Sequence, residues 1–296
     1  MSSDTAQFSG RKLDAPACML GEGPTYDPHT GTAWWFDIVG RKLIAYKLAS
    51  DDVTVHDLPV MGSVLARVDD TRQIIATETG LHLRHVASGE LELVTPIEAD
   101  NEVTRSNDGR VHQSGALWIG TMGKKAEKHA GAIYHVARGV VTRLFPDISI
   151  PNAICFSPDG ALAYFTDTMG GRLMRVAIDP ATGLPTGSPE VFHDHRGEHG
   201  GLDGAVCDAD GTIWNARWGG GCVDAYAPDG ARIRSLQVPA GQTTCPAFVG
   251  ENADRMIVTS AREGLSAEQL AADTGAGSTF QLDHPVKGRF EPDYIL

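Results

Sequence analysis

The chain has 296 residues, 42% of them hydrophobic, and its 25 basic and 38 acidic side chains give a formal net charge of −13. This length and apolar content allow one large β domain with a substantial core, and we expect a single domain over residues 1–296. The negative charge argues against nucleic acid and anionic membranes as partners, because both repel an acidic surface.

Signals for membrane insertion, secretion and disulfide bonding are weak. The absence of an 18-residue apolar run predicts that no transmembrane helix is present. The first ten residues lack the basic and apolar regions of a signal peptide. Five cysteines, an odd number without a CxxC spacing, disfavour a disulfide framework and a zinc-thiolate site. We therefore expect a protein of the reducing cytoplasm.

One structural unit recurs along the chain: an apolar run, a tight turn and a second apolar run. The clearest copy spans 152–168, where Ser-Pro-Asp-Gly forms the turn. Equivalent turns begin at residues 27, 69, 112, 157, 208 and 250, so the unit repeats every 42 to 51 residues. A period of this length with several short strands per unit is typical of a β-propeller. Six copies predict an all-β fold with six blades around a central channel.

In chain order, residues 1–15 form a polar lead-in with one strand predicted near Lys12, which should pair with the C-terminal strands and close the ring. The second blade is assigned strands at 53–56, 63–67, 73–77 and 81–84. The sixth is assigned to 232–262. A short helix is predicted at 266–270, and the segment 278–282 should form a strand that completes a blade.

Polar residues stand five positions before the turn in four of the six units, namely Glu22, Asn107, Asn152 and Asp203. Equivalent positions in a radial repeat occupy equivalent places around one axis, so these side chains should converge at one end of the channel. Val64 and Cys245 hold this place in the other two units. A single such residue is usually only a cap for its own turn, but four in register favour a site.

Arg105 and Asn107 alternate along the first strand of the third unit and so face the same way. Arginine offers a planar fork of donors, and asparagine offers both a donor and an acceptor, a pair that suits a polyhydroxylated ligand. A structural ion pair of Arg105 with Asp108 or Glu102 is an equal alternative.

Two loops concentrate charged or titratable side chains. The loop at 120–129 contains Lys125 and is either a lid over the channel mouth or an ordinary solvated loop. The second loop carries His193, His195 and His199 among acidic residues. Imidazoles attract soft metals, but the segment is rich in glycine and no helix sets the histidine spacing, so we favour an ordinary loop over a metal site.

Several segments together resemble the gluconolactonase/senescence-marker-protein-30 (regucalcin) family. They are Leu-Gly-Glu-Gly-Pro at 20–24, Arg-Ser-Asn-Asp-Gly-Arg-Val at 105–111, Trp-Ile-Gly-Thr-Met at 118–122, Ile-Pro-Asn at 150–152, Ser-Pro-Asp-Gly at 157–160, Leu-Asp-Gly at 202–204 and Ala-Arg-Trp-Gly-Gly-Gly at 216–221. The resemblance covers nearly the whole chain in family order. It implies a six-bladed propeller with one divalent metal ion at the channel.

The resemblance also assigns roles to residues. It implies that Glu22, Asn152 and Asp203 bind the metal ion, and that Arg105 and Asn107 bind the substrate. Two carboxylates and an amide oxygen suit Ca²⁺, Mg²⁺ or Mn²⁺, although Zn²⁺ and Fe²⁺ can occupy such a site. The chain departs from the family pattern where Lys125 replaces a substrate-contacting glutamate and where Phe-Val-Gly at 248–250 replaces Phe-Gly-Gly. As a substrate-binding residue, Lys125 would favour a lactone that bears a carboxylate; otherwise it faces solvent.

From these features we expect a lactone hydrolase of the gluconolactonase type. Its substrate would be an aldono-1,4- or 1,5-lactone, such as glucono-, galactono-, arabino- or xylonolactone, which it would hydrolyse to the aldonic acid. Asp203 would act as the general base. The alternatives are a metal-dependent aryl-ester or organophosphate hydrolase on the same site, and a non-enzymatic calcium-binding propeller. The sugar, the native metal and the oligomeric state stay open.

Overall fold

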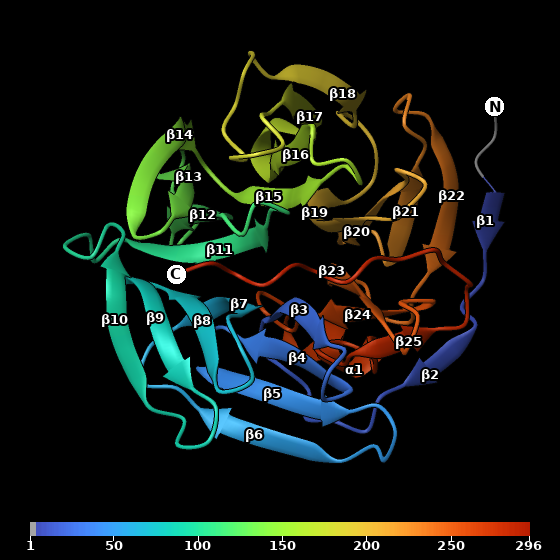
Figure 1. Ribbon diagram of the computed structural model, residues 1–296. Coiled ribbons are helices and arrows are strands. Elements are labelled where there is room, and N and C mark those ends of the chain that lie inside the picture. The colour runs from blue at the N-terminus through green and yellow to red at the C-terminus, as the bar shows by residue number, and fades with distance from the viewer. Residues whose placement is uncertain (1–3) are drawn as a thin grey trace.

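The computed structural model describes residues 4–296, and nearly all of its regular structure is β-strand. Six sheets, antiparallel except where β1 joins one of them, stand around a central channel, so the predicted six-bladed β-propeller is confirmed (Figure 1). The first strand of each blade lies nearest the axis, and the following strands lie progressively farther out.

The first three blades follow one another along the chain. Blade one contains β3 (Gly21–Asp27), β4 (Thr32–Asp37), β5 (Lys42–Lys47) and β6 (Val53–Asp57). Blade two contains β7 (Gly62–Arg67), β8 (Arg72–Thr77), β9 (Gly80–His85) and β10 (Leu91–Pro96). Blade three contains β11 (Thr104–Val111), β12 (Leu117–Gly123), β13 (Gly131–Ala137) and β14 (Val140–Ile148).

The last three blades include the two N-terminal strands. Blade four contains β15 (Pro151–Phe156), β16 (Leu162–Asp167), β17 (Arg172–Ala177) and β18 (Glu190–Asp194), with a 3₁₀ turn at Thr168–Gly170. Blade five contains β19 (Gly201–Cys207), β20 (Ile213–Trp218), β21 (Cys222–Tyr226), β22 (Arg232–Gln237) and β1 (Asp4–Ala6). Blade six contains β23 (Thr243–Val249), β24 (Arg255–Ser260), β25 (Phe280–Leu282) and β2 (Gly10–Lys12).

Apolar side chains between neighbouring blades form the core. Phe36 of blade one packs with Leu65 and Ile75 of blade two, and all three are buried. Full burial of a side chain of this kind stabilises the fold by roughly 1.5–3 kcal/mol relative to exposure. Because both faces of a blade are covered by its neighbours, the inner strands are buried on both sides rather than alternating with solvent.

The two ends of the chain close the ring. β2 pairs antiparallel with β25, with Arg11 opposite Gln281, so the strand predicted near Lys12 completes the last blade as expected. β1 adds in parallel to the outer edge of blade five through β22. The propeller is therefore closed by hydrogen bonds between segments about 270 residues apart, as the partners Arg11 and Gln281 show.

Two strand assignments made from sequence were wrong. The segment 53–57 pairs with β5 and is the outermost strand of blade one, whereas β10 is the outermost strand of blade two. Likewise, 232–237 pairs with β21 and belongs to blade five. Along the chain, the outermost strand of one blade is followed directly by the inner strand of the next blade. Its position in the sequence is therefore compatible with either blade, and only its hydrogen bonds show which sheet it joins.

The predicted helix is confirmed as α1 (Ala267–Ala272). Ser266 is its N-cap, and the side chains of Ser266 and Gln269 form a reciprocal capping box, which satisfies two amide groups at the start of the helix. Within residues 4–296, no helix is long and apolar enough to cross a membrane.

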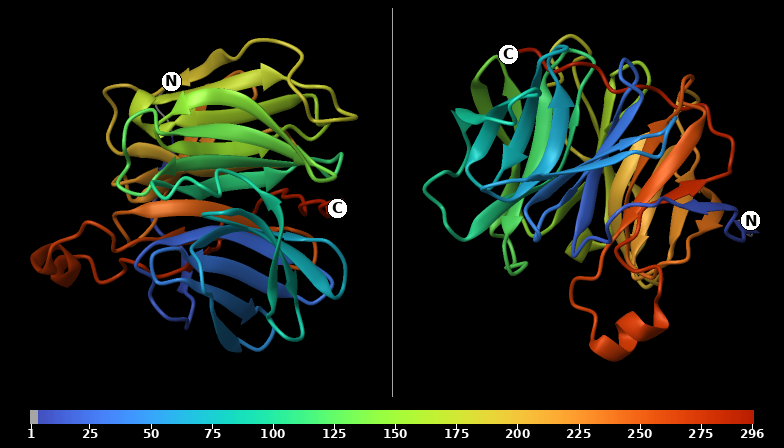
Figure 2. Two further views of the ribbon diagram at one scale, coloured as in Figure 1. Left: turned by 90° about the vertical axis from the view of Figure 1, so that its left-hand side faces the viewer. Right: turned by 90° about the horizontal axis from the view of Figure 1, so that it is seen from below.

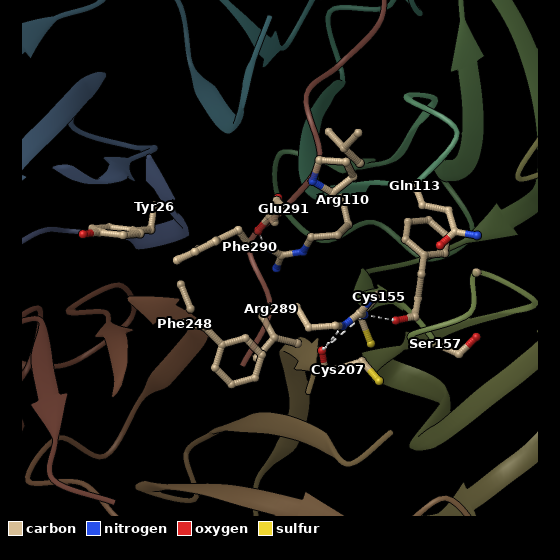
Figure 3. A pocket seen from close by; sticks show the side chains of 16 residues that line it. Tyr26, Arg110, Gln113, Cys155, Ser157, Cys207, Phe248, Arg289, Phe290 and Glu291 are labelled. Carbon is tan, nitrogen blue, oxygen red and sulfur yellow. Dashed lines mark hydrogen bonds and ion pairs between the residues drawn. The ribbon is translucent and has the colours of Figure 1, made fainter. Parts of the chain in front are cut away.

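The C-terminal segment, residues 283–296, crosses one end of the channel (Figure 1). Backbone hydrogen bonds connect it to blades six, five, three and two, through Ala253, Ala209, Gly115 and Arg67. Arg289 reaches blade four, where its Nη2 donates to the carbonyl oxygen of Phe156 at 2.8 Å. Figure 3 shows Arg289, Phe290 and Glu291 around a pocket at this end of the channel. Figure 2 shows α1 projecting from the opposite end.

Candidate metal centre and active site

A cavity of about 270 Å³ lies at the end of the channel away from the C-terminal segment. The inner strands begin at this end, and five of the six site residues singled out from sequence, all except Lys125, line the cavity. Its lining consists of Leu20, Glu22, Arg105, Asn107, Met122, Ala126, Ile150, Asn152, Thr168, Asp203, Trp218 and Glu263. The structure thus brings these polar side chains together from four different blades, and their individual roles stay predictions.

A β-bulge interrupts every inner strand near the site. In β3 the register shifts between Glu22 and Thr25, and in β15 it shifts between Asn152 and Cys155. The other four inner strands, β7, β11, β19 and β23, have the same irregularity. A bulge adds a residue on one strand, increases the local twist and redirects side chains, which is why bulges are common beside active sites. Here a bulge lies beside each polar residue that an inner strand contributes to the cavity.

The residues that follow two of the candidate ligands have left-handed backbone conformations. Gly23 has φ +55° and Ala153 has φ +56°. Glycine adopts this conformation at no steric cost, whereas alanine is strained there. Ala153 is fully buried next to Asn152. Backbone strain of this kind persists where the surrounding structure imposes it, and it is concentrated at functional sites.

Gly23→Ala should weaken divalent-metal binding and lower the free energy of unfolding. A Cβ at this position would lie 1.9 Å from the carbonyl oxygen of Ser63, so the backbone that carries Glu22 must move. Ala153→Gly is the matched control, because it removes strain at the equivalent place and should change stability by no more than about 1 kcal/mol. Thermal unfolding and metal titration measure both variants. Unchanged metal affinity in the Gly23 variant would contradict this account of the bulge.

A chain of hydrogen bonds orients the amide groups in the cavity. Arg105 Nη1 donates to Asn107 Oδ1 at 2.8 Å, and Asn107 Nδ2 donates to Asn152 Oδ1 at 2.9 Å. Asn152 Nδ2 donates to Thr168 Oγ1 at 3.0 Å, and that hydroxyl donates to the carbonyl oxygen of Leu202 at 2.7 Å. An amide oxygen has two acceptor positions, so Asn152 Oδ1 keeps one for a metal ion.

The alternative of a structural ion pair for Arg105 is not what the structure shows. Within residues 4–296, the guanidinium forms no ion pair with either Asp108 or Glu102, and it donates instead to Asn107 and to the carbonyl oxygen of Ser106. Asp108 accepts hydrogen bonds from the backbone amides of Ile154 and Gly109, at 2.7 and 2.9 Å. Arg105 is thus held at the cavity by a neutral partner and stays available to a ligand.

The buried carboxyl groups strongly affect one another. Burial, and secondarily repulsion by Asp108, raises the pKa of Glu22 to about 8. Burial and then Glu22 raise the pKa of Asp203 well above its ordinary value. Burial also raises the pKa of Asp108 to about 6. Confined carboxylates are costly as anions unless a cation compensates them.

The donor set fits a divalent metal ion. Glu22 and Asp203 supply two carboxylates, and Asn152 supplies an amide oxygen that its neighbours hold in place. Hard cations such as Ca²⁺, Mg²⁺ and Mn²⁺ prefer oxygen ligands of this kind. A cation among these groups would favour their ionised forms and offset the repulsion between them.

Of the seven cavity residues that were missed in the sequence, four share one place in the repeat. Met122, Thr168, Trp218 and Glu263 lie at or just beyond the ends of β12, β16, β20 and β24, the second strands of their blades. In an antiparallel hairpin the second strand ends where the first begins, so both positions face the same end of the channel. Their spacing follows the repeat, and that regularity was the signal that could have identified them.

The two charged loops occupy different places. Lys125 is exposed and lies outside the cavity lining, although its neighbour Ala126 is part of it. Lys124 ties the base of this loop to Glu78 of blade two at 2.6 Å. A direct contact of Lys125 with substrate stays a prediction. The histidine loop lies outside the cavity, and in it His195 is only 3% exposed whereas residues 196–199 are exposed.

Comparison with known proteins places the chain in a family. A relative from Rhizobium meliloti (strain 1021), provisionally named a sugar lactone lactonase, is 57% identical over 99% of this chain and 100% of its own length. The L-arabinolactonase of Azospirillum brasilense is 35% identical, over 88% of this chain and 87% of its own.

A solved structure of a regucalcin is also closely similar to this chain. The crystal structure of a calcium-binding protein, regucalcin, from Agrobacterium tumefaciens strain C58 superposes with a TM-score of 0.99 and 58% identity, and covers all of both chains. These relatives confirm the predicted class of enzyme, a lactone hydrolase of the gluconolactonase type. The family profile described as "SMP-30/Gluconolactonase/LRE-like region" matches residues 20–262, and the chain belongs to this family.

Proposed function

We propose that the protein is a metal-dependent hydrolase that opens an aldono-1,4- or 1,5-lactone to the aldonic acid. One observation carries this proposal: two buried carboxylates, an oriented amide oxygen and the Arg105–Asn107 pair line the same cavity. At about 270 Å³ the cavity is near the lower end of ligand pockets, which start at about 300 Å³, and this size suits a small substrate. The arabinolactonase relative makes pentonolactones the first substrates to test.

The cavity residues have three proposed roles: metal binding, substrate binding and proton transfer. Glu22, Asn152 and Asp203 would hold the metal ion, which when bound polarises the lactone carbonyl and lowers the pKa of a bound water. Arg105 and Asn107 hold the hydroxyl or carbonyl oxygens of the sugar and orient it. Arg105 is preorganised for this by its bond to Asn107.

Asp203 is the proposed proton carrier. Its carboxylate accepts a proton from the attacking water as the water oxygen bonds to the carbonyl carbon. The bond between that carbon and the ring oxygen then breaks, and Asp203 returns the proton to the ring oxygen. A general base works best when its pKa lies near the operating pH, and burial beside Glu22 moves the pKa of Asp203 upward from that of an ordinary aspartate.

Chelation should abolish lactone turnover and lower the melting temperature. At a free metal concentration 100 times Kd, binding stabilises a protein by about 2.7 kcal/mol, which is lost when the metal is stripped. Acid release from a panel of glucono-, galactono-, arabino- and xylonolactones, followed with a pH indicator, tests the proposal. The stripped enzyme receives Ca²⁺, Mg²⁺, Mn²⁺, Zn²⁺ or Fe²⁺ in turn.

The outcomes separate the candidate functions. Metal-dependent turnover of one lactone supports the proposal and identifies substrate and metal together. Turnover of aryl esters or organophosphates without any lactone would favour the alternative hydrolase. Metal-dependent stabilisation with no turnover of either class would favour a non-enzymatic calcium-binding propeller; the Agrobacterium tumefaciens structure is described as a calcium-binding protein. Full activity without metal would overturn the proposed mechanism.

A further inference from the structure

A second group of potential metal ligands lies outside the cavity. His193 stands near the end of β18 in the outer edge of blade four, and His195 and Glu198 follow in the loop that leads to blade five. One ring nitrogen of each histidine and a carboxylate oxygen of Glu198 all lie within 4.8 Å of one another. His195 is buried, and the side chain of His193 is 16% exposed.

The backbone around the two histidines holds their rings as metal-binding histidines are usually held. His193 Nδ1 lies 3.0 Å from the carbonyl oxygen of Gly230, and His195 Nε2 lies 3.1 Å from that of Gly200. In His193, a ring N–H at Nδ1 that donates to the Gly230 carbonyl fixes the tautomer and leaves Nε2 as a lone pair. For His193 this is the arrangement typical of histidines that bind metals. In His195, Nε2 also contacts Arg217 Nη2, which can only donate, so the Gly200 carbonyl holds the ring in place without fixing its tautomer.

The remaining ring nitrogens converge and have no hydrogen-bond partner. His193 Nε2 and His195 Nδ1 are both buried and unpaired within residues 4–296. Each lies 3.6 Å from an oxygen of Glu198, which is too long for a hydrogen bond. Two ligands of a tetrahedral zinc ion with bonds of about 2.0–2.1 Å are separated by roughly 3.4 Å. The spacing therefore matches ligands around one ion better than a network of direct hydrogen bonds.

Two arginines and two carboxylates around the histidines neutralise one another without a metal ion. A metal ion would have to compete with these ion pairs for Glu198. Arg217 pairs with Asp224 at 2.8 Å and contacts His195 Nε2. Arg232 pairs with Glu198 and lies 3.4 Å from Asp224. Burial, and secondarily Arg217, lowers the pKa of His195. Arg232 is 32% exposed and can turn away from Glu198 into solvent.

We propose that His193 Nε2, His195 Nδ1 and Glu198 form a second divalent-metal site, distinct from the channel cavity. Two imidazoles and one carboxylate with an open fourth position select zinc over calcium or magnesium, because the latter two prefer all-oxygen sites. The ion would connect the outer strand of blade four to the following loop. Through the bond of His193 to Gly230, it would also brace the β21–β22 turn of blade five. Its expected role is structural.

Zinc titration in a protein without the channel ligands tests this site alone. The parent is the full chain with Glu22→Ala and Asp203→Ala, stripped of metal and shown to be folded by circular dichroism. We expect it to bind one equivalent of Zn²⁺ by calorimetry, and Co²⁺ to give the visible absorption of a four-coordinate site. His193→Gln and Glu198→Gln in this parent should each weaken binding at least about 100-fold, since loss of even a supporting partner costs 10- to 100-fold.

Two further variants act as controls. His199→Gln changes an exposed histidine of the same loop and should leave zinc affinity unchanged. Arg232→Gln removes the competitor for Glu198 and should tighten binding several-fold. The proposal is overturned if the folded parent binds no zinc, or if the His193 and Glu198 variants bind as the parent does. None of these readouts involves lactone turnover, so failure here leaves the proposed function untouched.

Discussion

Asp203→Asn should reduce lactone turnover at least about 10³-fold without unfolding the protein. Asparagine has the same shape and keeps an oxygen that can face a metal ion, but it cannot accept a proton. General-base catalysis contributes about 10²–10⁴-fold, and the loss of one negative ligand adds to this. The carbonyl oxygen of Asp203, which accepts from Asn215 Nδ2 at 2.6 Å, is unaffected by the change.

The kcat and KM of the Asp203 variant are measured together with its metal affinity, because the two roles predict different patterns. Loss of the base alone lowers kcat at saturating metal, whereas loss of a ligand alone is repaired by added metal. Glu22→Gln, which weakens a ligand by removing its charge but removes no proposed base, should be the repairable case. Asp210→Asn is the control, since Asp210 lies on the surface and pairs with Lys287 at 2.7 Å. Turnover at the wild-type rate in the Asp203 variant would refute its role.

Glu291→Ala should lower the free energy of unfolding by about 3 kcal/mol. Glu291 comes from the C-terminal segment and pairs with Arg110, whose side chain is 8% exposed inside the channel. The other contacts of Arg110 are the carbonyl oxygen of Ala205 at 3.2 Å and the sulfur of Cys245 at 3.7 Å. Removing one partner of a buried ion pair costs about 3–5 kcal/mol, because a buried charge is left uncompensated, and partial exposure of Glu291 moderates this.

Asp293→Ala provides a matched control in the same C-terminal segment, because it removes one of the two acidic partners of Arg67. Asp293 is 47% exposed, so its loss should cost no more than about 1 kcal/mol. Urea or thermal unfolding compares the two variants. Replacing both members of the buried pair, as Arg110→Met with Glu291→Leu, should recover most of the lost stability, since an apolar pair leaves no buried charge. Equal effects of the Glu291 and Asp293 changes would contradict the assignment.

Sequence alone determined the repeat, the blade number and the main polar positions of the cavity. Turn residues and apolar runs are local signals, and they repeat because each blade must bury its apolar faces against two neighbouring blades in the same way. The five-residue offset placed Glu22, Asn107, Asn152 and Asp203 at equivalent points of that repeat, and the structure brings all four to one cavity. The Ser266 capping signal was also local, and α1 follows it directly.

Only the tertiary structure decided which sheet each outer strand joins, because β6 and β22 have the same local pattern whichever neighbour they pair with. It also brought the second-strand residues Thr168 and Glu263 into the cavity and set Glu291 against Arg110. The cluster of His193, His195 and Glu198 has the same origin, since Gly230 of the next blade orients one ring. These arrangements depend on closure of the ring, which places residues far apart in the chain side by side, and no local pattern in the sequence encodes that distance.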